Sequence, residues 1–161
     1  MNGSFSSDDV IVGDDGDNAI NGFGGTDTLT GTGGNDELVA YDGSGGILDG
    51  GAGRDLVLFD SGPVEVDLAA GNATGGTGTD SLIAIEDVRG SPSTDVIRGD
   101  EGPNHLIGAD QNDRLFGRGG DDVLDGGTDR DPRPRGERDL ADGGDDADVC
   151  RRAGEKIGCE A

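Results

Sequence analysis

Apolar and polar positions recur with a nine-residue period near the start of the chain. Residues Gly13 to Val39 form three consecutive nonapeptides, GDDGDNAIN, GFGGTDTLT and GTGGNDELV. Position 8 of each unit is a branched apolar residue, namely Ile20, Leu29 or Leu38. One apolar side chain between outward-facing neighbours is typical of a very short strand, so each unit predicts one strand and one turn.

The polar positions of these units predict tight turns. Each unit has Gly at positions 1 and 4, and Asn18, Asp27 or Asp36 at position 6. Gly permits positive φ angles and close approach of a neighbouring backbone. Nine residues then form half a coil, and units two apart in the sequence lie one above the other at the strand spacing of about 4.8 Å. We therefore expect Asp9 to stack near Asp27, and Asn18 near Asp36.

The same frame continues through most of the chain. Ten units fit it, and they begin at residues 4, 13, 22, 31, 50, 75, 90, 99, 108 and 117. Position 4 is not Gly at Ser93 and Gln111, so we expect altered turn geometry there. The regular stretches 4–58 and 75–125 predict two stacks within one domain that covers residues 1–161.

Three segments depart from the frame. The unit 40–49 has ten residues rather than nine. The linker 59–74 contains VEVDL, whose alternation of apolar and acidic residues predicts a half-buried strand from Val64 to Leu68, with larger loops around it. The segment from Asp131 to Arg138, DPRPRGER, predicts an exposed loop. The frame then returns, and Cys150 falls at position 8, where it should point inward.

Cys150 and Cys159 are the two cysteines of the chain. Such a pair near the end of the chain indicates one disulfide and an oxidising compartment. The bridge would fold the tail of the C-terminal part, 126–161, over the open end of the stack. Reduced or metal-binding thiols are the alternative.

Composition argues against an ordinary apolar core. Leu, Ile, Val and Phe account for 33 of 161 residues, the net charge is -23, and there are 34 glycines. This combination borders on that of disordered chains. We therefore expect the metal-free chain to be largely unfolded, with bound ions stabilising the folded form alone.

The charge also limits the partners. The 35 acidic residues against 12 basic ones would repel nucleic acid and anionic membrane surfaces, and no run of about 18 apolar residues is present to span a bilayer. Residues 1–89 hold 17 acids and 2 bases (net -15), and residues 90–161 hold 18 acids and 10 bases (net -8). The N-terminal part should therefore need a counter-ion more.

Stacked carboxylates call for a bound cation. Two carboxylates one strand spacing apart repel by a few kcal/mol even at an effective dielectric constant of about 20. Carboxylates and the free carbonyls of Gly-rich turns are the oxygen ligands that Ca²⁺ takes, whereas Mg²⁺ keeps its waters and demands octahedral geometry. The pattern therefore favours several Ca²⁺ ions.

These units resemble the RTX (repeats-in-toxin) calcium-binding nonapeptide, G-G-x-G-x-D-x-U-x. The resemblance implies an all-β fold, a right-handed parallel β-roll or β-helix solenoid with Ca²⁺ in the turns. It also implies that backbone carbonyls near positions 2 and 4 complete each site. The expected side-chain ligands occupy position 6, and they are Asp9, Asn18, Asp27, Asp36, Asp55, Asp80, Asp95, Asn104, Asp113, Asp122 and Asp148.

The resemblance is nearest to secreted actinobacterial members of this family. Extracellular calcium suits weak sites of this kind. We therefore expect a secreted, monomeric, non-catalytic module that folds on binding Ca²⁺, whose signal segment has been removed from this sequence. The partner is calcium, and a protein partner is not specified by the sequence.

Other functions have weaker support. No stretch matches an EF-hand loop or a phosphate-binding Gly loop. The single histidine, His105, falls at position 7 and should face solvent. Two alternatives stay open: an adhesion or protein-interaction spacer that presents the loop from Asp131 to Arg138, and a non-catalytic fragment of a larger secreted enzyme or toxin.

Overall fold

Short strands form all of the regular structure in the part of the chain that can be described. The computed structural model describes residues 1–41, 45–76, 78–127, 139–153 and 155–159, and within them there are strands and turns but no helix. The expected all-β class is confirmed. The predicted loop from Asp131 to Arg138 lies outside the described residues.

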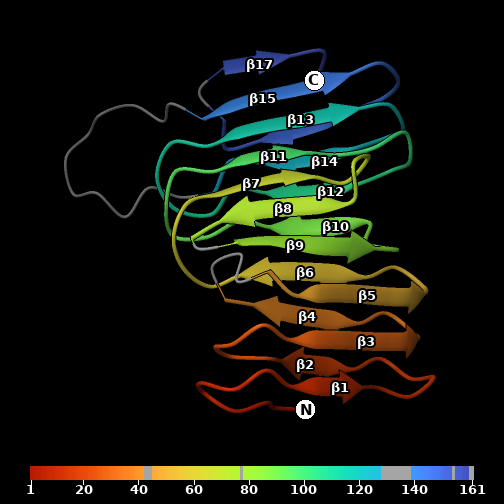
Figure 1. The fold of residues 1–161 in the computed structure, drawn as a ribbon. Coiled ribbons are helices and arrows are strands. Elements are labelled where there is room, and N and C mark those ends of the chain that lie inside the picture. The colour runs from red at the N-terminus through yellow and green to blue at the C-terminus, as the bar shows by residue number, and fades with distance from the viewer. Residues whose placement is uncertain (42–44, 77, 128–138, 154, 160–161) are drawn as a thin grey trace.

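The strands lie in two sheets that face each other (Figure 1). Among the described residues, the ten-stranded sheet has the order β1 (Val10–Val12), β3 (Thr28–Gly33), β5 (Ile47–Ala52), β9 (Gly78–Ile83), β8 (Asn72–Gly75), β7 (Val64–Asp67), β11 (Val96–Arg98), β13 (Arg114–Arg118), β15 (Leu140–Gly144) and β17 (Glu155–Ile157). The seven-stranded sheet has the order β16 (Val149–Arg151), β14 (Val123–Asp125), β12 (His105–Ile107), β10 (Asp87–Arg89), β6 (Leu56–Phe59), β4 (Glu37–Ala40) and β2 (Ala19–Asn21).

Within the regular stretches, consecutive strands alternate between the sheets and strands two apart pair in parallel. Ile20 of β2 pairs with Leu38 of β4, and Ile97 of β11 pairs with Leu115 of β13, an 18-residue separation in both cases. One coil is therefore two nonapeptides, and the predicted parallel β-roll is confirmed.

The position-8 side chains form the core between the sheets. In β2, β4 and β12, the position-8 residue is buried and its two neighbours in the strand are more exposed. The inward residues are at most 8% exposed, and they include Ile20, Leu29, Leu38, Leu48, Val57, Leu82, Ile97, Leu106, Leu115, Leu124 and Cys150. Because each strand contributes about one such side chain, the core is a single narrow column.

The segment 59–83 breaks the parallel pattern with an antiparallel meander rather than with the larger loops expected there. The predicted strand is present as β7, and β7 pairs with β8, which pairs with β9, both antiparallel. Gly71 permits the tight turn into β8, with φ of 66° and its N–H donating to the carbonyl of Leu68. The three strands lie between β5 and β11, whereas β6 and β10 are direct neighbours in the opposite sheet.

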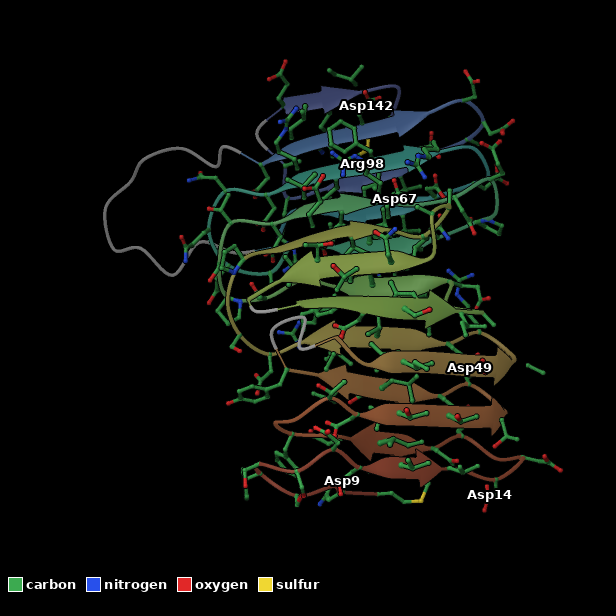
Figure 2. The ribbon with its side chains drawn as sticks, viewed as in Figure 1. Asp9, Asp14, Asp49, Asp67, Arg98 and Asp142 are labelled. Atoms are coloured by element: carbon green, nitrogen blue, oxygen red, sulfur yellow. A yellow bond between two sulfur atoms is a disulfide. The ribbon has the colours of Figure 1, made fainter. Side chains whose placement is uncertain are left out.

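A long-range ion pair anchors the meander to the second stack. The guanidinium of Arg118 donates to both carboxylate oxygens of Asp67 at 2.8 Å and to the carbonyl of Gly99 at 2.7 Å. A shorter outer-face pair joins Arg98 to Glu65 at 2.7 Å. Figure 2 shows Asp67 and Arg98 on the outward-facing side of the ten-stranded sheet.

A disulfide closes the C-terminal end of the roll. Cys150 lies inward on β16, as predicted, and is bonded to Cys159, which follows β17. The bridge therefore ties the last described strand of the ten-stranded sheet to the last strand of the seven-stranded sheet. Within the described residues, no helix has the length and apolar character required to cross a membrane.

We expect the column of inward residues to be sensitive to truncation. Leu106→Ala removes a fully buried side chain and should lower the free energy of unfolding by about 2–5 kcal/mol, measured by denaturation in saturating calcium. His105→Ala, at the outward-facing neighbour on the same strand, is the matched control and should cost less than about 0.5 kcal/mol. Equal losses in the two variants would contradict the assigned core.

Candidate metal centre

The position-6 side chains stack along the two edges of the roll. The Oδ1 atom of Asp27 accepts the backbone N–H of Asp9 at 2.9 Å, and that of Asp36 accepts the N–H of Asn18 at 2.8 Å. Both predicted stackings are thereby confirmed. The same bond, from one coil to the next, joins Asp36 to Asp55, Asp95 to Asp113, Asn104 to Asp122, and Asp122 to Asp148.

The two edges carry separate series of these side chains. At one edge the chain passes from the ten-stranded to the seven-stranded sheet, and we call it the ten-to-seven edge; the other is the seven-to-ten edge. Figure 2 shows Asp14 in a turn of the first and Asp9 in a turn of the second. Asp36, Asp55, Asp122 and Asp148 lie on the ten-to-seven edge, and Asp27, Asp95 and Asp113 lie on the seven-to-ten edge.

Two members of these series were missed by the nonapeptide frame. Glu86 Oε2 accepts the N–H of Asp55 at 2.8 Å, and Asp139 Oδ1 accepts the N–H of Asp113 at 2.9 Å. Glu86 has no Gly five residues before it, and residues 128–138 separate Asp139 from Gly126. The usable signal was an acid two residues before an inward apolar residue, which both possess.

At the meander, two predicted residues receive other backbone donors. Asp80 accepts the N–H groups of Gly45 and Gly46 at 2.9 and 2.7 Å. Asp95 accepts the N–H of Val64 at 2.8 Å. Asp80 therefore lies beside the irregular unit 40–49 of the preceding coil, which has no acid at that place, and Asp95 lies beside the start of β7 in the meander.

Within the described part of the chain, four carboxylates of the ten-to-seven edge have a buried oxygen with no hydrogen-bond partner. Asp36, Asp55, Asp122 and Asp148 are at most 2% exposed, and in each Oδ1 accepts a backbone N–H while Oδ2 accepts nothing. A buried ionised oxygen without a partner is strongly destabilising. The four form two pairs on successive coils, Asp36 with Asp55 and Asp122 with Asp148, so each pair fits a shared cation.

The position-1 glycines make room for these oxygens. A Cβ atom on Gly31 would lie 2.0 Å from Oδ2 of Asp36 and 2.5 Å from the carbonyl oxygen of Gly50. A Cβ atom on Gly117 would lie 2.2 Å from Oδ2 of Asp122 and 2.4 Å from the carbonyl oxygen of Gly143. Carboxylate and carbonyl oxygens thus converge on one small space in each turn, which is the donor set that Ca²⁺ prefers.

Side chains alone do not make a complete metal site. Across the described ranges, no three His, Cys, Asp or Glu side chains gather closely enough to hold a metal ion. A bound ion therefore needs backbone carbonyls in addition to one or two carboxylates. The stacked glycine carbonyls beside Asp36 and Asp122 are such groups.

The two departures from Gly at position 4 have different outcomes. Gln111 adopts φ of 75°, so its turn keeps the left-handed conformation that Gly has at this position in other units, such as Gly34 with φ of 96°. Ser93 does not adopt a positive φ. The same holds for Gly16 and Gly102 at position 4 of their units, so the turn of Ser93 has a geometry that Gly also adopts there. The expected change of turn geometry is therefore wrong for the unit of Gln111 and stays a prediction for that of Ser93.

Burial makes these carboxylates harder to ionise. It raises the pKa of Asp122 to about 6, and the charges of Asp148, Asp100 and Asp121 add to that effect. Burial likewise raises the pKa of Asp95 to about 6 and moves the pKa values of Asp55 and Glu86 upward. A cation near these groups would relieve the same unfavourable charge that the raised pKa values record.

Comparison with known protein families points to the same chemistry. The RTX calcium-binding nonapeptide repeat, described as four copies, matches residues 4–38, 89–124 and 98–131. Repeats of this family bind Ca²⁺ ions in their turns. No curated protein matches the chain. The matched residues include the turns of Asp36 and Asp122, where the structure leaves carboxylate oxygens without partners.

We expect Gly31→Ala to weaken both folding and calcium binding. The new Cβ would overlap Oδ2 of Asp36, so the free energy of unfolding should fall by about 1–3 kcal/mol with a parallel loss of calcium affinity by calorimetry. Gly16→Ala is the control, because its Cβ would meet nothing closer than 3.3 Å and its φ is not positive. Unchanged calcium affinity in Gly31→Ala would contradict this geometry.

In excess chelator, we expect mild acid to favour the folded state. Asp122 and Asp95 have a pKa of about 6 when folded, against about 3.9 for an unfolded aspartate. The stability that their protonation supplies is complete below the unfolded pKa and is lost as pH rises through about 6. The strand signal in circular dichroism should therefore be larger near pH 5 than near pH 7.5. A larger signal at the higher pH would show the opposite linkage.

Proposed function

Because the chain is an RTX-type repeat protein, a calcium-binding repeat module, we propose that it is secreted, non-catalytic and folds when Ca²⁺ binds in its turns. Residues 1–161 act as one domain and as a monomer, with calcium as the partner and no role for nucleic acid. RTX repeat proteins are in general extracellular and structural, which supports the first two parts of this proposal.

The main support for this proposal is the set of buried carboxylate oxygens on the ten-to-seven edge that have no hydrogen-bond partner. Asp36 and Asp55 bring two buried carboxylates to successive coils, and Asp122 and Asp148 bring two more. Without a cation, each pair would hold two like charges about one strand spacing apart in a buried turn. A Ca²⁺ ion supplies the missing positive charge and the missing ligand contacts for both oxygens of a pair.

The rest of the chain has little other stabilisation available. The core is one column of inward side chains, and the net charge of -23 opposes compaction. An ion that binds only the folded form adds about 2.7 kcal/mol per site at a concentration 100-fold above its dissociation constant. Several such sites are comparable to the whole stability of an ordinary domain, which is about 5–15 kcal/mol.

The oxidising environment of a secreted protein agrees with the disulfide at the C-terminal end. Cys150 and Cys159 are bonded to each other, and structural disulfides persist mainly outside the cytosol. A non-catalytic role agrees with the single histidine of the chain, His105, whose strand turns its neighbour Leu106 into the core and His105 outward.

The proposal predicts a calcium-driven transition from coil to strand. In excess chelator at neutral pH, far-ultraviolet circular dichroism should show a largely unfolded chain, and millimolar Ca²⁺ should restore the strand signal. Mg²⁺ at the same concentration is the control and should restore much less, because it resists dehydration and requires octahedral geometry. A strand-rich, compact chain in chelator would refute folding on calcium.

Individual carboxylates can be tested by charge-matched variants. Asp36→Asn removes a buried ligand and should lower the number of bound Ca²⁺ ions and the calcium affinity. Asp49→Asn makes the same change of net charge on the outer face of β5, where Figure 2 shows Asp49, and should leave the ion count unchanged. Equal ion counts in Asp36→Asn and the unsubstituted chain would remove Asp36 from the ligand set.

A further inference from the structure

Outside the meander, the described turns that keep the nonapeptide frame fall into two conformational groups that differ at position 2 of the unit. In one group the residue at position 2 has a left-handed backbone, with φ of 92° at Thr32, 96° at Gly51, 79° at Arg118 and 98° at Gly144. These are the turns of Asp36, Asp55, Asp122 and Asp148, whose buried Oδ2 atoms have no hydrogen-bond partner. We call this group the open turns.

Two described turns of the opposite edge share the open conformation. Phe23 and Ala109 have φ of 62° and 88°, and they precede Asp27 and Asp113 in their turns. The N–H group of Phe23 donates to the side chain of Asn21, two residues earlier, rather than to the position-6 carboxylate. The left-handed conformation therefore directs the position-2 N–H of Phe23 away from Asp27.

The second group of turns is closed by hydrogen bonds within the turn. Asp14, Ser91 and Asp100 occupy position 2 without a positive φ. Their N–H groups donate to the position-6 oxygens of Asn18, Asp95 and Asn104 at 2.8, 2.6 and 2.9 Å. In these closed turns, a backbone N–H holds the oxygen atom that an ion would otherwise contact.

The turn of Asp95 is closed although its position-6 residue is a carboxylate. The Ser91 hydroxyl lies 3.0 and 3.1 Å from the two oxygens of Asp95 and can donate to either, and the Val64 N–H donates to Oδ1. Both oxygens thus have partners, and the turn is fully buried at Ser91 and Asp95. Pro92 explains the conformation, because a residue before proline is driven toward extended backbone.

A second serine has the same role in the first coil, where the turn is one residue longer. Gly3 takes the place of the position-1 glycine there, because a Cβ on it would lie 2.6 Å from the carbonyl oxygen of Gly22 and 2.8 Å from Oδ2 of Asp9, and Ser4 follows it as Ser91 follows Gly90. The N–H and the hydroxyl of Ser4 donate to Oδ2 of Asp9 at 2.6 and 2.9 Å. Two aspartates of the position-6 series, Asp9 and Asp95, are therefore satisfied by a nearby serine. Both lie on the seven-to-ten edge.

We infer that Ca²⁺ occupies the open turns only, and that the closed turns of Asp9, Asn18, Asp95 and Asn104 hold their shape without an ion. The conformation at position 2 is the determinant, because it decides whether the position-6 oxygen faces an N–H donor or an empty ligand position. Ser91 with Pro92 is then a specificity determinant that excludes calcium from a unit whose aspartate would otherwise bind it. This inference rests on the proposed calcium-binding function.

The closed turns have a consequence for the block of repeats after the meander. The units of Ser91 and Asp100 are consecutive, and they follow the turn of Glu86 and strand β10 after the meander. The first two nonapeptide turns of the second block, one at each edge, therefore need no ion. The open turns of Asp113 and Asp122 are stacked on them, one coil further along.

The first test compares two isosteric variants by counting bound ions. Equilibrium dialysis against Ca²⁺, with metal analysis of the protein, should give Asp95→Asn the same ion count as the unsubstituted chain. Asp122→Asn, in an open turn, should lose at least one ion. A loss in Asp95→Asn as large as that in Asp122→Asn overturns the inference but leaves the calcium-binding function intact. An unsubstituted chain that binds no Ca²⁺ overturns both.

The second test opens the closed turn. The double variant Ser91→Gly/Pro92→Gly removes the hydroxyl and the proline constraint, so its folded form in calcium should bind one ion more than the unsubstituted chain. Ser93→Gly is the control, because it restores Gly at position 4 but keeps the Ser91 bonds, and its ion count should not change. An extra ion in Ser93→Gly, or none in the folded double variant, would overturn the inference even if Asp95→Asn fails to fold.

Discussion

The repulsion between carboxylates stacked one strand spacing apart is the constraint on which the whole roll depends. Asp36 and Asp55 are buried in two successive turns of one edge, and Asp122 and Asp148 are buried in two more further along it. Two unit charges about 4.8 Å apart repel by roughly 3 kcal/mol at an effective dielectric constant of about 20. A core that is one side chain wide cannot offset several such terms, so the fold and the ion requirement have a single physical origin.

The two oxygens of each stacked carboxylate have different roles. Oδ1 of Asp55 accepts the N–H of Asp36 in the preceding coil, which satisfies a backbone donor that no strand pairing reaches. Oδ2 faces the glycine of its own turn, where a Cβ at Gly50 would lie 2.5 Å away. The acid therefore holds neighbouring coils together through one atom and leaves the other for a ligand, which explains why the motif needs both the acid and the glycine.

Part of the charge is balanced by the chain's own cations. Arg118 binds Asp67 across the meander, Arg54 binds Asp87 at 2.7 Å, and Arg152 binds Asp125. The amide of Asn104 donates to the carbonyl of Glu86 at 2.9 Å. Such contacts are concentrated where the repeat is irregular, at the meander and at the C-terminal end, whereas the regular N-terminal turns depend on their stacked acids.

The nonapeptide period by itself determined the all-β class, the parallel stacking of units two apart, the inward column and most of the position-6 series, because these follow from local spacing alone. The tertiary structure decided the antiparallel meander, since the pairing of β8 depends on which strands are available beside it rather than on any period. It also brought Glu86 and Asp139 into the edge series. It also decided which carboxylates have an oxygen free for a ligand. Asp95 and Asp122 occupy the same position of the motif, but Oδ2 of Asp95 accepts the N–H of Ser91, whereas the left-handed backbone of Arg118 leaves Oδ2 of Asp122 without a hydrogen-bond partner.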